Sequence, residues 1–171
     1  MTPPSSTNPP QIMADLKEHV RYMMYGRKPE PIFIRHTATS KSSDDKQYLK
    51  LRNDYCQKHF KSIRVNDKYK GKLKGRVVCV FDDYLTYGNT FEALRNLLIK
   101  CEVKKIIFVS IGKFKCSGES QYVQKSFSIE GDVYSGRYTA EFNTDAKHDV
   151  KFDFAARRSL ENLMQLAEHL Q

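Results

Sequence analysis

Two short, strongly apolar segments separated by a helical pattern constrain the fold more than any other feature of the chain. Val77 to Phe81 is a continuous run of mostly branched residues, and Lys105 to Ile111 is a second run of this kind. Between them, Thr90 to Cys101 places its leucines at helical spacing. A strand, a helix and a strand in so short a stretch predict a right-handed βαβ unit with parallel strands buried on both faces. The fold class we expect is therefore α/β.

Weaker patterns surround this unit. Before it, the patterns predict a helix at Gln11 to Tyr25, a short strand at Pro31 to His36 and a polar loop at Thr37 to Lys46. They then predict a second helix at Asp45 to Phe60, a short strand at Ser62 to Asn66 and a lysine-rich turn at Asp67 to Gly75. After it, the patterns predict three strands, at Gln124 to Glu130, Gly136 to Phe142 and Val150 to Phe154, and a final amphipathic helix at Ala155 to Leu170. The polar loop has one apolar residue, Ala38, so we expect it to be mobile.

The length of 171 residues suits one domain with a real core. All six prolines lie within the first 31 residues, which predicts a flexible Pro-rich tail at 1–10, a helix and connector at 11–30, and the main domain at 31–171. The apolar runs are too short to span a membrane, and the first residues lack the basic and apolar parts of a secretory signal. Four cysteines without a CxxC pair suit a reducing compartment, so we expect a cytoplasmic protein.

The connection between the first apolar run and its helix carries the chemistry. It reads Asp82-Asp83-Tyr84-Leu85-Thr86-Tyr87-Gly88-Asn89-Thr90. Ligands of open α/β sheets collect at the carboxyl ends of the strands. Gly88 permits a backbone turn that directs successive N–H groups toward one anion, and the hydroxyls of Thr86 and Thr90 are further donors. Together with the first amides of the helix, these groups predict a phosphate site.

The two acids point to a sugar beside that phosphate. Carboxylates repel a phosphate, so Asp82 and Asp83 should instead accept protons from hydroxyl groups or hold a divalent ion. A phosphate next to vicinal hydroxyls describes ribose 5-phosphate. The plainer alternative is an ordinary acidic βα turn that Asn89 or Thr90 caps.

The order of these residues resembles the signature of type I phosphoribosyltransferases: an apolar strand, two acids, then Thr, Gly and Thr at fixed spacing. The resemblance implies a Rossmann-like parallel sheet, here with extra C-terminal strands and a terminal helix. It also implies binding of phosphoribosyl pyrophosphate (PRPP), with Mg2+ as cofactor. The reaction of that family is a glycosyl transfer of nucleotide metabolism, in which the phosphoribosyl group is joined to a nitrogen nucleophile and pyrophosphate is released. Asp82 and Asp83 would be the catalytic pair that binds the ribose hydroxyls. The phosphate would be cradled by Thr86, Tyr87, Gly88, Asn89 and Thr90.

Upstream residues narrow the resemblance to the competence protein F group of this family. They are Ile34-Arg35-His36-Thr37, Gln47, Leu49, Arg52-Asn53 and His59-Phe60. In type I enzymes this region is a flexible loop over the pyrophosphate, which makes Arg35, Lys41 and Arg52 candidates for that contact. The alternative interpretation is that these three residues belong to a solvated basic surface.

The chain also departs from the family. Tyr87 stands where members carry a small residue, and Thr86 stands where hypoxanthine-guanine enzymes carry an Asp, so that subclass is not expected. No pyrophosphate-binding strand and loop precede Ile32, so either the chain is a fragment or the site is incomplete. A second copy of the chain or a missing N-terminal portion would complete it. The resemblance covers residues 31 to 114, and the acceptor nucleophile has no motif here.

A second hypothesis is a non-catalytic module that senses PRPP or associates with nucleic acid. The net charge of +9 requires an anionic partner of some kind. The run Lys68 to Arg76 could contact a phosphate backbone while Tyr69 stacks on a base. The alternative interpretation of this run is a solvated turn before a strand.

Overall fold

The computed structural model describes residues 30–39, 52–113 and 121–149, together with Asp15, Glu18, His19 and Tyr22. This part of the chain is a mixed α/β structure with one parallel and two antiparallel pairs of strands. In chain order its elements are β1 (Phe33–Arg35), the 3-10 helix η1 (Asn53–Cys56), α3 (Gln57–Phe60), β2 (Ile63–Val65), the 3-10 helix η2 (Asp67–Tyr69), β3 (Val77–Leu85), α4 (Asn89–Lys100), β4 (Lys105–Lys113), β5 (Gln121–Asp132) and β6 (Arg137–Asp149).

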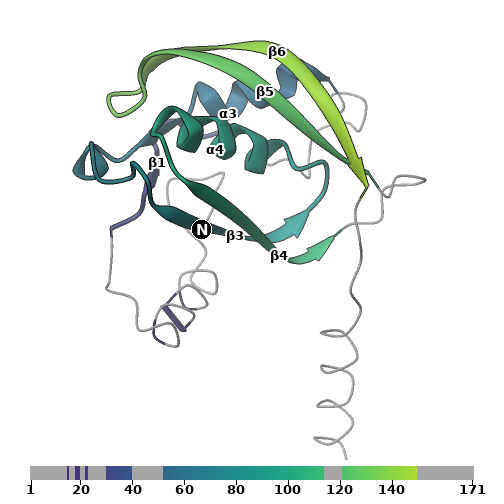
Figure 1. Ribbon diagram of the computed structural model, residues 1–171, viewed down its shortest axis with the longest axis horizontal. Helices are drawn as coiled ribbons and strands as arrows, with labels where there is room; N and C mark the ends of the chain where they lie inside the picture. Colours follow the sequence, from purple (N-terminus) through teal and green to yellow (C-terminus); the bar gives the residue numbers. More distant parts are fainter. Residues whose placement is uncertain are drawn as a thin grey trace, which may run out of the picture.

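Helix α4 lies at the centre of the described structure. Figure 1 shows it between the β3–β4 pair on one side and the long β5–β6 hairpin on the other. Because both sides are covered, the helix is buried over most of its circumference, unlike a surface helix with one apolar stripe. Its buried residues are Asn89, Phe91, Glu92, Ala93, Leu94, Asn96, Leu97 and Leu98. The core therefore forms around this helix, which contributes three polar side chains, Asn89, Glu92 and Asn96, to the buried region.

The predicted βαβ unit is confirmed. Strands β3 and β4 pair in parallel from Val77 opposite Lys105 to Leu85 opposite Lys113, with α4 between them in sequence. The prediction that both faces of these strands are buried is wrong. In β3 the side chains alternate: Val80 is 1% exposed, whereas Val77 is 59% exposed. Both α4 and the hairpin lie on the same side of the pair (Figure 1), so the described elements cover only that face.

The hairpin is longer than the sequence predicted. Strands β5 and β6 pair antiparallel from Gln121 opposite Asp149 to Asp132 opposite Arg137, with an irregularity at Ser126/Phe127. Phe127 packs edge-on against Phe60 of α3, with ring centroids 4.9 Å apart. The Tyr138 hydroxyl lies within hydrogen-bond distance of two carbonyl oxygens, those of Phe60 and Ile63. These contacts hold the middle of the hairpin against α3 and β2.

The short elements before β3 agree with the sequence where the structure describes them. Strands β1 and β2 pair antiparallel, and residues 53–60 are helical as η1 and α3. Of the predicted N-terminal helix, the four described residues are helical. Some predicted segments lie outside the described residues. They are the tail at 1–10, most of the connector and of the loop at 37–46, the strand at 150–154 and the helix at 155–170. None of the described helices is long and apolar enough to cross a membrane.

The central position of α4 predicts a large difference between two truncations on the same helix. Leu97 is fully buried, whereas Ile99 is 51% exposed. We expect Leu97→Ala to lower the free energy of unfolding by about 2–5 kcal/mol. Ile99→Ala should cost less than about 1 kcal/mol, because it leaves no cavity. Urea unfolding followed by circular dichroism measures both, and equal losses would contradict the central role of the helix.

Candidate functional site

The connection from β3 to α4 is shorter than predicted. Asp82 and Asp83 lie in β3 rather than in the loop, because β4 continues to Lys113 and the ladder continues with it. Asp82 is opposite Ser110 in that ladder. Since side chains two apart on a strand share a face, Asp82 lies on the same face as the buried Val80, toward α4. The turn itself is Thr86 to Gly88, and the helix begins at Asn89, one residue earlier than predicted.

Gly88 is the N-cap of α4 and adopts the left-handed conformation, with φ 71° and ψ 7°. The predicted need for glycine at this position is thus confirmed by its backbone. A second reason was not visible in the sequence: a Cβ at Gly88 would lie 2.4 Å from Cε2 of Tyr122 in β5. Any side chain here would therefore be strained and would also displace the ring of Tyr122.

The predicted phosphate-binding residues are brought together by this turn. Thr86, Tyr87 and Thr90 are half-buried, and Asn89 is buried. The N-cap glycine has no side chain with which to accept a hydrogen bond from the first turn of α4. The helix therefore starts with amide groups that no capping side chain satisfies, at the carboxyl end of a parallel strand. This arrangement suits an anion.

The three basic residues predicted to contact pyrophosphate are not presented together. Arg35 is buried in β1, where its guanidinium donates to Oγ of Ser62 (2.5 Å) and to Oγ1 of Thr39 (3.1 Å). Burial lowers the pKa of this group. Arg52 is exposed. Lys41 lies outside the described residues.

The basic run from Lys68 to Arg76 is partly engaged within the protein. Lys68 forms an ion pair with Glu30, and Lys74 forms one with Glu102 at 2.6 Å. The ring of Tyr69 is half-buried, and its hydroxyl donates to the Glu30 carbonyl at 2.5 Å. Stacking on a base would thus require Tyr69 to leave contacts that it makes in this structure.

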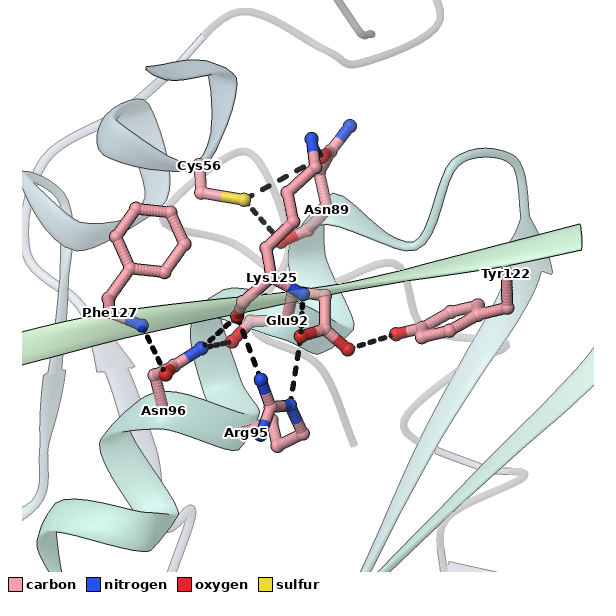
Figure 2. Close-up of polar contacts among 8 residues, drawn as sticks. All are labelled: Cys56, Asn89, Glu92, Arg95, Asn96, Tyr122, Lys125 and Phe127. Atoms are coloured by element: carbon pink, nitrogen blue, oxygen red, sulfur yellow. Dashed lines mark hydrogen bonds and ion pairs between the residues drawn. The ribbon is translucent and has the colours of Figure 1, made fainter. Parts of the chain in front are cut away.

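A buried polar network next to the turn was missed by sequence reasoning. Figure 2 shows it between α4 and β5. At its centre is Glu92, whose side chain is 1% exposed. Its Oε2 accepts from Nε of Arg95 (2.8 Å) and from the backbone N–H of Lys125 (2.8 Å), and its Oε1 accepts from the Tyr122 hydroxyl (2.6 Å). Burial and the charge of Glu92 both raise the pKa of Tyr122, so this hydroxyl stays protonated and donates.

Asn96, one turn further along α4, extends the network. Its amide nitrogen donates to the carbonyls of Lys125 and Glu92, both at 2.8 Å, and its oxygen accepts from the N–H of Phe127 at 2.9 Å. Arg95 also donates to the Lys125 carbonyl at 2.8 Å. Side chains of α4 thus pair with the edge of β5 as a neighbouring strand would. Polar residues at helical spacing were the available signal, but that pattern is also typical of a solvent-exposed face.

The side chain of Lys125 connects the hairpin to the start of α4. Lys125 is 3% exposed, and its ammonium donates to Oδ1 of Asn89 (2.8 Å) and to the carbonyl of Arg52 (3.1 Å). The fully buried thiol of Cys56 lies 3.6 Å from both oxygens of Asn89. Burial raises the pKa of this thiol to about 12. Cys56 is therefore a neutral core group rather than a nucleophile.

The network predicts unequal effects for two Glu→Gln variants. Glu92→Gln removes the charge that three donors share, and should lower the free energy of unfolding by about 3–5 kcal/mol. Glu102→Gln is the matched control, because the Glu102–Lys74 pair is largely exposed and should contribute less than about 1 kcal/mol. Thermal and urea unfolding at neutral pH measure both. A Glu92→Gln protein as stable as the control would show that the network does not hold the hairpin.

Comparisons with known proteins identify no relative of this chain. No family model, no curated protein and no solved structure matches this chain.

Proposed function

We propose that the protein binds ribose 5-phosphate or PRPP through the β3–α4 connection, with the 5′-phosphate at the N terminus of α4. The observation that carries this proposal is the left-handed Gly88, which turns the chain from the end of a parallel strand directly into a helix that has no capping side chain. Helix N-termini at the carboxyl edge of parallel strands are common sites for phosphate groups.

The energies require several contacts. The field of the helix contributes about 0.3–1 kcal/mol, or about 2 kcal/mol when partly buried. Micromolar affinity needs about 8 kcal/mol. Charge-assisted hydrogen bonds contribute about 1.5–3 kcal/mol each. The turn amides and the hydroxyls of Thr86 and Thr90 are the donors for the phosphate, and the carboxylate of Asp82, on the face of β3 toward α4, is the acceptor for the ribose hydroxyls.

The finer fold assignment rests on the same unit. We propose that β3, α4 and β4 are the phosphate-binding βαβ unit of a type I phosphoribosyltransferase fold, nearest to the competence protein F group. The parallel pairing, the acids at the end of β3 and the spacing of Thr86, Gly88 and Thr90 support this assignment. The hairpin lies outside residues 31 to 114, which carry the resemblance.

The resemblance also implies magnesium. Among the residues that the structure describes, no three metal-ligating side chains form a group. Magnesium commonly takes one or two carboxylates and completes its shell with phosphate oxygens and water. Asp82 fits that role, with most of the remaining ligands coming from the pyrophosphate of PRPP. The ion would offset the charge of the pyrophosphate.

The first test measures the affinity for both ligands. In calorimetric titrations of ribose 5-phosphate and of PRPP with magnesium, we expect Asp82→Asn and Thr90→Ala each to weaken binding by about 10- to 100-fold, because each removes one charge-assisted hydrogen bond. Thr139→Ala, an exposed residue of β6, is the control and should bind as the wild type does. Gly88→Val is avoided because it would collide with Tyr122.

Two results would contradict the proposed function. One is wild-type protein that binds neither ligand at millimolar concentration. The other is unchanged affinity in both Asp82→Asn and Thr90→Ala, which would mean that the ligand binds elsewhere.

Transfer of the phosphoribosyl group to a nitrogen nucleophile is a separate proposal, and we expect it to be slow. Such a reaction gains most of its rate where the leaving group is positioned and its charge stabilised. Arg35, one of the candidates for that contact, is already bonded to Ser62 and Thr39. We would measure pyrophosphate release from PRPP and magnesium with a panel of nucleobases and amines. Rapid release that is abolished by the double variant Asp82→Asn, Asp83→Asn would contradict this expectation.

A further inference from the structure

The network between α4 and β5 contains more positive than negative charge. Glu92 is its one carboxylate, and Arg95 and Lys125 are its two cations among the described residues. Arg95 pairs with Glu92. The ammonium of Lys125 donates instead to two neutral oxygens, those of Asn89 and Arg52. Buried charges are generally paired with an opposite charge, because desolvation is costly. Lys125 thus stands out as a buried cation with neutral acceptors.

The position of this cation adds to the cost. Asn89 is the first residue of α4, where the helix carries its partial positive charge. Figure 2 shows the side chains of Lys125 and Asn89 next to each other, both pointing away from Glu92. A full positive charge and the positive end of a helix therefore lie together at the turn that contains Gly88. An anion bound at this place would offset both.

We propose that Lys125 supplies the buried positive charge that stabilises the phosphate of the ligand at the N terminus of α4. This inference rests on the proposed function and adds a determinant to the same site. Lys125 belongs to the hairpin, outside the residues that resemble the phosphoribosyltransferase signature. Asn89 acts as a positioning residue, because its side-chain oxygen holds the ammonium at the helix start.

The chemistry of the ammonium suits this role. It has three N–H donors, of which two are used by Asn89 and Arg52, so a third can donate to a phosphate oxygen. Direct contact is not required for the charge to act. At a separation of a few ångströms, the attraction between a cation and an anion is far stronger when both are shielded from water than when both are in solvent.

A purely structural role for Lys125 predicts a different outcome for binding. If the ammonium acts only as a clamp between Asn89 and the Arg52 carbonyl, Lys125→Met should destabilise the free protein, because both oxygens lose a donor, but the folded variant should bind phosphate as the wild type does. If the charge also serves a ligand, Lys125→Met should in addition weaken phosphate binding by the folded protein. The affinity of the folded protein thus separates the two hypotheses.

The experiment compares the wild type, Lys125→Met and the control Lys147→Met, which changes an exposed lysine of the same hairpin. Ribose 5-phosphate and inorganic phosphate are titrated by calorimetry at low salt, and thermal unfolding is recorded without ligand. We expect Lys125→Met to weaken binding of both ligands about tenfold or more, measured at a temperature at which its unfolding curve shows the variant to be folded. Lys147→Met should change neither the affinity nor the melting temperature.

A pH series gives a readout that a clamp would not affect. The phosphate of the ligand gains its second negative charge near pH 6. Wild-type affinity for ribose 5-phosphate should therefore rise from pH 5.5 to pH 7.5, and the rise should be smaller in Lys125→Met.

Each failure has its own meaning. Equal affinity of the wild type and the folded Lys125→Met variant would overturn this inference and leave the proposed function intact. A wild type that binds neither ribose 5-phosphate, PRPP nor inorganic phosphate would overturn both.

Discussion

A buried carboxylate on the central helix accepts hydrogen bonds from both that helix and the hairpin that covers it. Glu92 accepts hydrogen bonds from its own helix through Arg95 and from the hairpin through the N–H of Lys125 and the hydroxyl of Tyr122. A charge placed so deeply is costly unless every lone pair is used. The hydrogen bonds of Glu92 are therefore complete only when the hairpin lies on α4 and Tyr122 lies over the turn at Gly88.

The turn and the hairpin consequently form one structural unit. Gly88 leaves room for the ring of Tyr122, and Asn89 receives the ammonium of Lys125. A strand that follows β4 in sequence thus contributes to the start of the helix that precedes β4. If this turn binds a phosphate, as we propose, the hairpin supplies part of its electrostatic environment, and the selectivity of the site depends on residues far from the signature in the chain.

Local patterns predicted part of this arrangement. The apolar runs around Val80 and Phe108 and the leucines of α4 specified a βαβ unit, and the left-handed conformation of Gly88 follows from its place between a strand and a helix. The burial of Glu92 and Lys125 could not be predicted, because polar residues at helical or strand spacing are normally solvated. Their burial depends on the long-range packing of the hairpin on α4, and so does the one-sided packing of β3.

The way in which α4 holds β5 has a consequence for how such a chain can vary. Asn96 and Glu92 bond to the amide and carbonyl groups of Lys125 and Phe127, which every residue type except proline possesses. Most positions of β5 can therefore change without loss of these bonds, whereas no other side chain reproduces the paired donor and acceptor of Asn96 at that length. In related sequences the helix should vary slowly and the strand it holds should vary quickly, with Tyr122 and Lys125 as exceptions because their side chains take part in the network.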